Sequence, residues 1–176
     1  MKFLLLLYVF ISTSIYANDL IGTWYNCDSS EKNIHFGHVI EFDKDNLEIE
    51  VHVAHEPSSK PCGGKIIMVI GSNWHYETDG EKFKSMLFTT NATLLDLKSV
   101  NLFNKNKICG NSKWEIDKRV DCTNKKQNGF ILPVGYKSEH KYLIRENELE
   151  ATTEDGEILI YKKEVAVTKE PNSKVV

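Results

Sequence analysis

The chain has 176 residues, of which 22 are Lys or Arg and 25 are Asp or Glu, and its formal net charge is −3. A slightly acidic chain without a basic stripe excludes nucleic acid as an expected partner, because phosphate binding requires clustered positive charge. Hydrophobic residues make up 41% of the chain. This length and composition predict one domain with a core of its own.

The first 17 residues have the pattern of a secretory signal peptide. Met1-Lys2 is a short basic start, and it is followed by an apolar run and by small residues that end at Ala17. The apolar run is too short to cross a bilayer core of about 30 Å as a helix. We therefore expect cleavage after Ala17, a secreted or periplasmic protein and no transmembrane segment. The folded domain would span 18–164, and 165–176 would form a flexible C-terminal tail.

All four cysteines follow this segment, so an oxidising compartment would make disulfides the default. Four cysteines allow three pairings. We favour Cys27 with Cys62 and Cys109 with Cys122, because the second pair brackets a hairpin-like segment. A zinc site is the alternative, but the chain has no close pair of the C-x-x-C kind.

The first predicted hairpin joins 35–42 to 47–54 through the turn-forming cluster 43–46. Pairing Phe42 with Leu47 gives one apolar face, interrupted by His38, and one face of charged residues. We expect the apolar face to point into the core. It comprises Phe36, His38, Ile40, Phe42, Ile49, Val51 and Val53, and the outward face carries Glu41, Glu48, Glu50 and His52.

The second predicted hairpin joins 73–78 to 81–88 through Asp79-Gly80, a dipeptide typical of two-residue turns. This register puts Glu77 opposite Lys82 on the outward face. The inward face would carry Trp74, Tyr76, Phe83, Ser85 and Leu87. A third hairpin, between 148–153 and 158–163, turns at Asp155-Gly156.

Further strands are expected at 65–70, 92–97, 113–120, 130–136 and 140–145, and only 91–102 shows a weak helical period. About eight to ten short strands indicate a barrel or a sandwich, and closure removes exposed edges. The predicted fold is therefore all-β, an antiparallel meander closed into a β-barrel, with minor helix and disulfide staples.

Leu20-Ile21-Gly22-Thr23-Trp24 opens the predicted domain and resembles the Gly-x-Trp motif of lipocalins and bacterial lipocalin-like (calycin) domains. The resemblance implies that Gly22 begins the first strand and that Trp24 packs across the closed end of the barrel. The segment 156–163 is similar to the last strand of these domains. By the same resemblance, Lys162 or Lys163 would cover the Trp24 ring.

The inward aromatic side chains could line a cavity or fill a solid core. We predict a cavity that sequesters a small, mostly apolar or amphipathic ligand. A lone imidazole on an apolar face requires a hydrogen-bond partner, and a ligand head group or water would supply one. The predicted ligand-binding residues are Phe36, His38, Phe42, Val51, Trp74, Tyr76 and Phe83.

Two alternatives belong to other functional classes. A filled barrel would suit a protein–protein interaction or inhibitor module with a protein partner. A histidine-based periplasmic metal binder would use His35 and His52, which lie diagonally on the outward face in the predicted register. The chain has no Gly-x-Ser-x-Gly, His-Glu-x-x-His or phosphate-binding glycine motif, so we expect no enzymatic activity and no cofactor.

Overall fold

The computed structural model describes residues 19–164 except 31, 112, 124 and 126–130. The predicted signal peptide and the predicted C-terminal tail lie outside the described residues. Among the residues that are described, no helix is long and apolar enough to cross a membrane.

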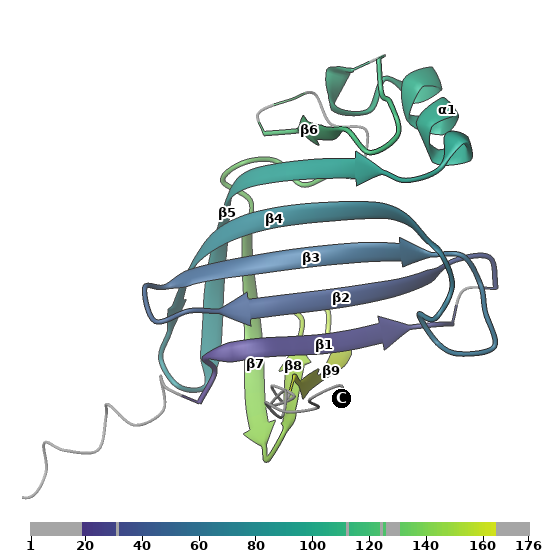
Figure 1. Ribbon diagram of the computed structural model, residues 1–176. Helices are drawn as coiled ribbons and strands as arrows, with labels where there is room; N and C mark the ends of the chain where they lie inside the picture. The colour runs from purple at the N-terminus through teal and green to yellow at the C-terminus, as the bar shows by residue number, and fades with distance from the viewer. Residues whose placement is uncertain (1–18, 31, 112, 124, 126–130, 165–176) are drawn as a thin grey trace, which may run out of the picture.

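Eight antiparallel strands close into a barrel, as the sequence predicts (Figure 1). The ring runs β1, β2, β3, β4, β5, β7, β8 and β9, and β9 pairs back onto β1. Figure 1 shows β1 to β4 side by side at the front, with β7 to β9 crossing behind them. The strands are β1 (Gly22–Asp28), β2 (His35–Phe42), β3 (Leu47–His55), β4 (Ile66–Thr78), β5 (Lys82–Leu94), β7 (Lys137–Arg145), β8 (Glu148–Thr152) and β9 (Ile158–Lys163).

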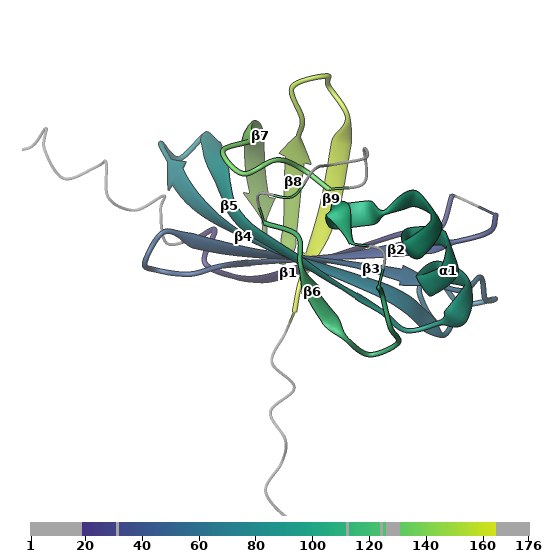
Figure 2. The ribbon, with the colours of Figure 1, turned by 90° about the horizontal axis from the view of Figure 1, so that it is seen from above.

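The chain between β5 and β7 lies outside the ring of strands and covers one of its ends. It contains the helix α1 (Leu97–Asn106), the 3₁₀ turn η2 (Ile108–Gly110) and the short strand β6 (Arg119–Asp121). Figures 1 and 2 place α1 beside the end of β5. Strands were predicted over 113–120 and 130–136. β6 overlaps only the end of the first range, and the described residues 131–136 form no strand.

Asp96 caps the N-terminus of α1, and its carboxylate accepts a 2.6 Å hydrogen bond from the Ser99 backbone N–H. Lys107 caps the C-terminus in a left-handed backbone conformation. Val100 and Phe103 are its buried residues. The helix therefore packs against the barrel end through one apolar face.

The predicted register between β2 and β3 is wrong by one residue. Phe42 pairs with Glu48 rather than with Leu47. The connecting loop is one residue longer because Asn46 adopts a positive φ of 61° and the Asp43 carboxylate accepts from the Leu47 backbone N–H. Since side chains alternate along a strand, this shift exchanges the two faces of β3. Glu48, Glu50, His52 and Ala54 point into the barrel, and Ile49, Val51 and Val53 point outward.

The turn between β4 and β5 also differs from prediction, but its faces do not. Asp79 N–H donates to the Lys82 carbonyl, so the turn residues are Gly80 and Glu81, with Gly80 at a φ of 95°. The pairing is displaced by two positions along β5, so Glu77 pairs with Lys84 rather than with Lys82. The predicted inward set is confirmed, because Trp74, Tyr76, Phe83, Ser85 and Leu87 are all buried.

Both predicted disulfides are present. Cys27 is bonded to Cys62, and the bridge joins β1 to the loop between β3 and β4. Cys109 is bonded to Cys122, and the bridge joins η2 to the residue that follows β6. The second bridge therefore ties together the chain that covers one end of the barrel.

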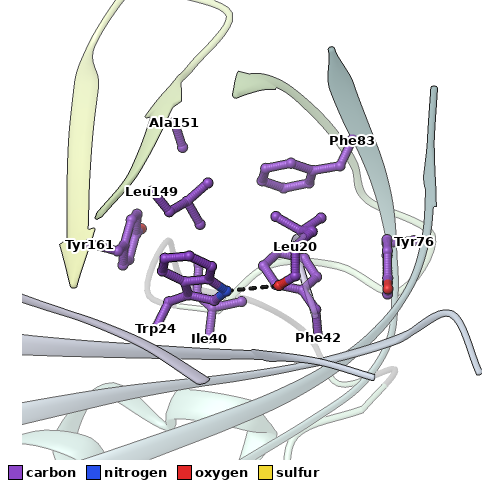
Figure 3. Close-up of a cluster of buried hydrophobic side chains, with 9 residues drawn as sticks. All are labelled: Leu20, Trp24, Ile40, Phe42, Tyr76, Phe83, Leu149, Ala151 and Tyr161. Carbon is purple, nitrogen blue, oxygen red and sulfur yellow. Dashed lines mark hydrogen bonds between the residues drawn. The ribbon is translucent and has the colours of Figure 1, made fainter. Parts of the chain in front are cut away.

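The opposite end of the barrel, here called the closed end, is filled by a cluster around Trp24 (Figure 3). Trp24 is 0% exposed, and its indole N–H donates a 2.8 Å hydrogen bond to the Leu20 carbonyl. Lys163 Nζ lies 4.9 Å from the centre of the Trp24 ring, so Lys163 supplies the expected cation. The cluster comprises Leu20, Trp24, Ile40, Phe42, Tyr76, Phe83, Leu149, Ala151 and Tyr161.

Candidate functional site

The end of the barrel covered by α1, here called the cavity end, holds a cavity of about 460 Å³. Inward side chains of β2 to β5 form its wall, and residues of α1 and of the segment 131–132 complete its lining. Its surface is mostly apolar, with polar groups at its base. The lining residues are Ile34, Phe36, Glu50, His52, Ala54, Ile67, Met68, Ile70, Ser72, Trp74, Thr90, Ser99, Leu102, Phe103, Ile131 and Leu132.

Three titratable side chains meet where the cavity gives way to the closed end, and we call them the His–Glu–His cluster. His38 Nε2 lies 2.7 Å from Glu50 Oε1, and His52 Nε2 lies 3.4 Å from the same oxygen. The two imidazoles stack with their centres 4.1 Å apart. The cluster forms because His38 pairs with His52 across β2 and β3. Glu50 lies two positions before His52 on the same face of β3.

Tyr161 connects this cluster to the closed end. Its hydroxyl lies 2.8 Å from His38 Nδ1. With Nε2 protonated, a neutral His38 donates to the Glu50 carboxylate and accepts from the Tyr161 hydroxyl, so both ring nitrogens have partners. The lone inward imidazole predicted from the sequence therefore finds its partners within the protein itself.

Burial and hydrogen bonding move the pKa values of this cluster in different directions. Burial raises the pKa of Glu50, but hydrogen bonds and charge attraction from His38 and His52 outweigh it, and the pKa is held below its ordinary value. Burial lowers the pKa of His38. Burial also raises the pKa of Tyr161. The favoured state is thus an ionised Glu50 beside a neutral His38.

A second inward carboxyl group, Glu48, behaves differently. It is only 4% exposed and accepts a hydrogen bond from the Ser85 hydroxyl. Burial, together with the nearby Glu50 charge, raises the pKa of Glu48 from 4.5 to about 8. At neutral pH the barrel therefore holds one ionised and one protonated carboxyl group on the same strand.

The predicted ligand-binding residues separate into four locations. Phe36 and Trp74 line the cavity, and His38 belongs to the His–Glu–His cluster next to it. Val51 lies on the outer face because of the corrected register. The remaining three, Phe42, Tyr76 and Phe83, are packed in the closed end.

The histidine pair considered for a metal, His35 and His52, is not brought together. His35 pairs with His55, whereas His52 pairs with His38. His35 and His38 are three positions apart on one strand, so they point to opposite faces. The residues that do meet include Glu50, which the predicted register placed outside.

The sequence did not predict that Glu48 and Glu50 point inward, nor that α1 lies beside a cavity. The alternation of Glu48, Glu50 and His52 was visible, but it was assigned to solvent because apolar side chains usually face the core. The Asp96-x-x-Ser99 cap was the available signal for the helix over the cavity.

No protein-family model matches this chain, and no curated protein matches it closely enough to count as a relative. The features that bear on function are therefore the cavity and the side chains at its base. The apolar wall favours the burial of a hydrocarbon group, and the polar base favours a group that can form hydrogen bonds.

Proposed function

We propose that this protein is an exported, lipocalin-like (calycin) binding protein that sequesters a small, mostly apolar ligand with a polar head group. The observation that carries the proposal is the cavity of about 460 Å³ with apolar walls and a polar base. Binding sites for small molecules are typically of about 300 to 1,000 Å³ and combine these two features. The protein would act by removing its ligand from water, without catalysis.

The ligand's apolar part would lie against the cavity wall. Met68 and Ile70 on β4 and Phe103 on α1 contribute to this wall. Removing apolar surface from water stabilises a complex by about 25 cal/mol per Å² before the costs of association. A hydrocarbon chain or a ring system is the expected chemistry for this part.

The ligand's polar part would lie at the base, near Glu50 and His52. A wholly apolar occupant would bury these groups without water, which is unfavourable. Ser72 and Thr90 add hydroxyl groups to the same lining. A head group that offers hydrogen-bond donors matches the Glu50 carboxylate best, because an ionised carboxylate only accepts.

The cavity favours this proposal over an interaction module with a filled barrel. Two clusters are packed as solid cores, one at the closed end and one around Phe103 and Trp114, but the space lined by the inward side chains of β2 to β5 is not filled by the protein.

A fluorescence titration with anilinonaphthalene sulfonate, a dye that brightens in apolar surroundings, tests the proposal. We expect one dye molecule per chain, quenching of Trp74 emission, and displacement of the dye by a long-chain amine more readily than by an alkane. Dye binding that no amphiphile displaces would contradict the proposal.

A matched pair of variants locates the binding. Ala54 is 2% exposed and lines the cavity, so Ala54→Phe should fill it and weaken dye binding. Ile49 is 41% exposed on the outward face of the same strand, so Ile49→Phe should leave binding unchanged. Equal affinities for the two variants would show that the dye binds elsewhere.

Export is part of the proposal, and the two disulfides fit an oxidising compartment. Expression of the full chain with a bacterial secretion system should yield a product that begins at Asn18. Intact-mass analysis measures this directly. A secreted product that retains residues 1–17, or no secreted product, would refute this part.

A further inference from the structure

We propose that the His–Glu–His cluster is a binding site for a divalent transition metal ion, with Zn²⁺ as the representative ion. One donor atom from each of His38, Glu50 and His52 lies within 4.8 Å of the others. Within the part of the chain that the structure describes, this is the group of His, Cys, Asp or Glu that meets this criterion. The site goes beyond ligand sequestration and does not depend on it.

The donor set suits zinc and its neighbours in the first transition series. Two imidazoles and one carboxylate are a common protein ligand set for a zinc ion that keeps a further position open. Hard cations such as Mg²⁺ prefer oxygen ligands and would be disfavoured by the two imidazoles. The expected order of affinity therefore places Zn²⁺ far above Mg²⁺.

The distances from the Glu50 carboxylate to the two imidazoles are close to those that a zinc ion requires. Tetrahedral ligand atoms at about 2.1 Å from zinc lie about 3.4 Å from each other. His52 Nε2 and Glu50 Oε1 are already 3.4 Å apart. His38 Nε2 and Glu50 Oε1, at 2.7 Å, would have to separate by a small side-chain rotation to admit the ion.

The strands hold these side chains in place. His38 and His52 form one cross-strand pair, and Glu50 pairs with Ile40 two positions further along the same ladder. Ligands held on paired strands are positioned more firmly than ligands on loops. The side chains of His38 and Glu50 are also only 17% and 14% exposed, so contacts with the surrounding protein restrict their movement.

Tyr161 provides an outer partner for the metal ligand His38. Metal binding at Nε2 requires the His38 proton to reside on Nδ1, where it would donate to the Tyr161 oxygen 2.8 Å away. His38 stays neutral in this exchange, since the proton leaves Nε2 and another occupies Nδ1. Tyr161 changes from donor to acceptor.

The metal would be reachable from the cavity. Glu50 and His52 are both cavity-lining residues as well as members of the cluster. Coordination positions not filled by the protein would therefore face the cavity and be taken by water. The same space would admit a metal-binding group of a ligand.

The test is a calorimetric titration of the chelator-treated, tag-free protein with Zn²⁺, followed by Co²⁺ absorption spectroscopy. We expect one Zn²⁺ per chain and the visible bands of Co²⁺ with nitrogen and oxygen ligands. His52 is the best position for a variant because its side chain is 44% exposed and contributes least to packing. His52→Ala and Glu50→Gln should each weaken Zn²⁺ binding by at least about 100-fold, since each removes a direct ligand.

Control variants use the same residue types on the outer surface. His75 and Glu41 are exposed, so His75→Ala and Glu41→Gln should bind Zn²⁺ like the parent. Tyr161→Phe should keep one Zn²⁺ per chain but weaken it by about 10-fold, the effect of losing an outer partner. Circular dichroism of each variant verifies that it is folded.

Absence of Zn²⁺ binding by the folded parent would overturn the proposal. So would an unchanged affinity in folded His52→Ala, or an equal loss in His75→Ala. Dye binding to the metal-free parent reports on the cavity alone. If the dye binds and Zn²⁺ does not, the ligand-binding proposal stands and the metal site is refuted.

Discussion

The two ends of this barrel are built from the same strands but have opposite contents. At the closed end, Trp24 and its neighbours fill the interior with apolar side chains. At the cavity end, a cavity and the His–Glu–His cluster lie beside a second packed cluster around Phe103 and Trp114. The change occurs along individual strands: β2 presents Phe42 and Ile40 to the closed end and then His38 beside the cavity. Under the proposed function, the ligand would therefore bind at one end of the sheet, while the Trp24 cluster fills the other.

This division implies that substitutions at the two ends should separate stability from binding. A packed core loses free energy when atoms are removed, because its surroundings collapse only in part. A residue beside a cavity has fewer contacts to lose.

Trp24→Ala should lower the free energy of unfolding by about 3 to 5 kcal/mol, because it empties the centre of the closed end. Trp74→Ala, at the wall of the cavity, should cost at least about 1 kcal/mol less, since one side of that ring faces open space. Urea denaturation measures both. Equal losses would show that the two ends are packed alike.

Glu48 should make the protein less stable as pH rises. Its pKa is raised from 4.5 to about 8, so above pH 4.5 the unfolded chain releases a proton that the folded protein retains. At about 1.4 kcal/mol per pH unit, stability should fall by up to about 4 kcal/mol between pH 5 and pH 8.

Glu48→Gln should remove this slope, because the amide keeps the shape of the side chain and does not titrate. Urea denaturation at a series of pH values provides the measurement, and Glu41→Gln at an exposed position is the control. A parent whose stability does not fall over this pH range would show that Glu48 ionises normally.

Removal of the Cys109–Cys122 bridge by a double Ala substitution should cost about 3 kcal/mol, the value expected for a short disulfide loop. The bridge ties the chain that covers the cavity end. Amide hydrogen exchange should therefore rise in α1 more than in β1 or β2. Uniform exchange across the barrel would contradict the separation of the two ends.

Lys163→Met should cost about 0.5 to 1 kcal/mol, the contribution of a cation over an aromatic face. Its Nζ lies 4.9 Å from the centre of the Trp24 ring. The neighbouring Lys162 is exposed and provides the control, so Lys162→Met should be neutral. Thermal denaturation of the two variants and the parent measures this difference in stability.

The sequence predicted the closed end well because its signals are local and redundant. Trp24 is buried at this end as expected, and so are the predicted inward aromatic residues Tyr76 and Phe83. The β4–β5 turn is shifted, but each partner moves by two positions, and side chains keep their face under such a shift.

The inward face of β3 was mispredicted because its register depends on one loop residue. A single extra loop residue, made possible by the positive φ of Asn46, turned Glu48 inward beside Phe42 and turned Glu50 inward at the cavity. The apolar face of β3 had predicted the opposite, since burying apolar side chains is the usual outcome. Polar residues placed against the general pattern are expected where a protein binds something.

A methyl NMR titration tests the central claim most directly. The protein would be labelled at Ala, Ile, Leu and Met methyl groups and titrated with a long-chain amine. The account predicts shifts at Ala54, Met68 and Ile70 in the cavity and none at Ile40 and Leu149 in the closed end. Shifts confined to the closed end, or no shifts at saturating amine, would contradict it.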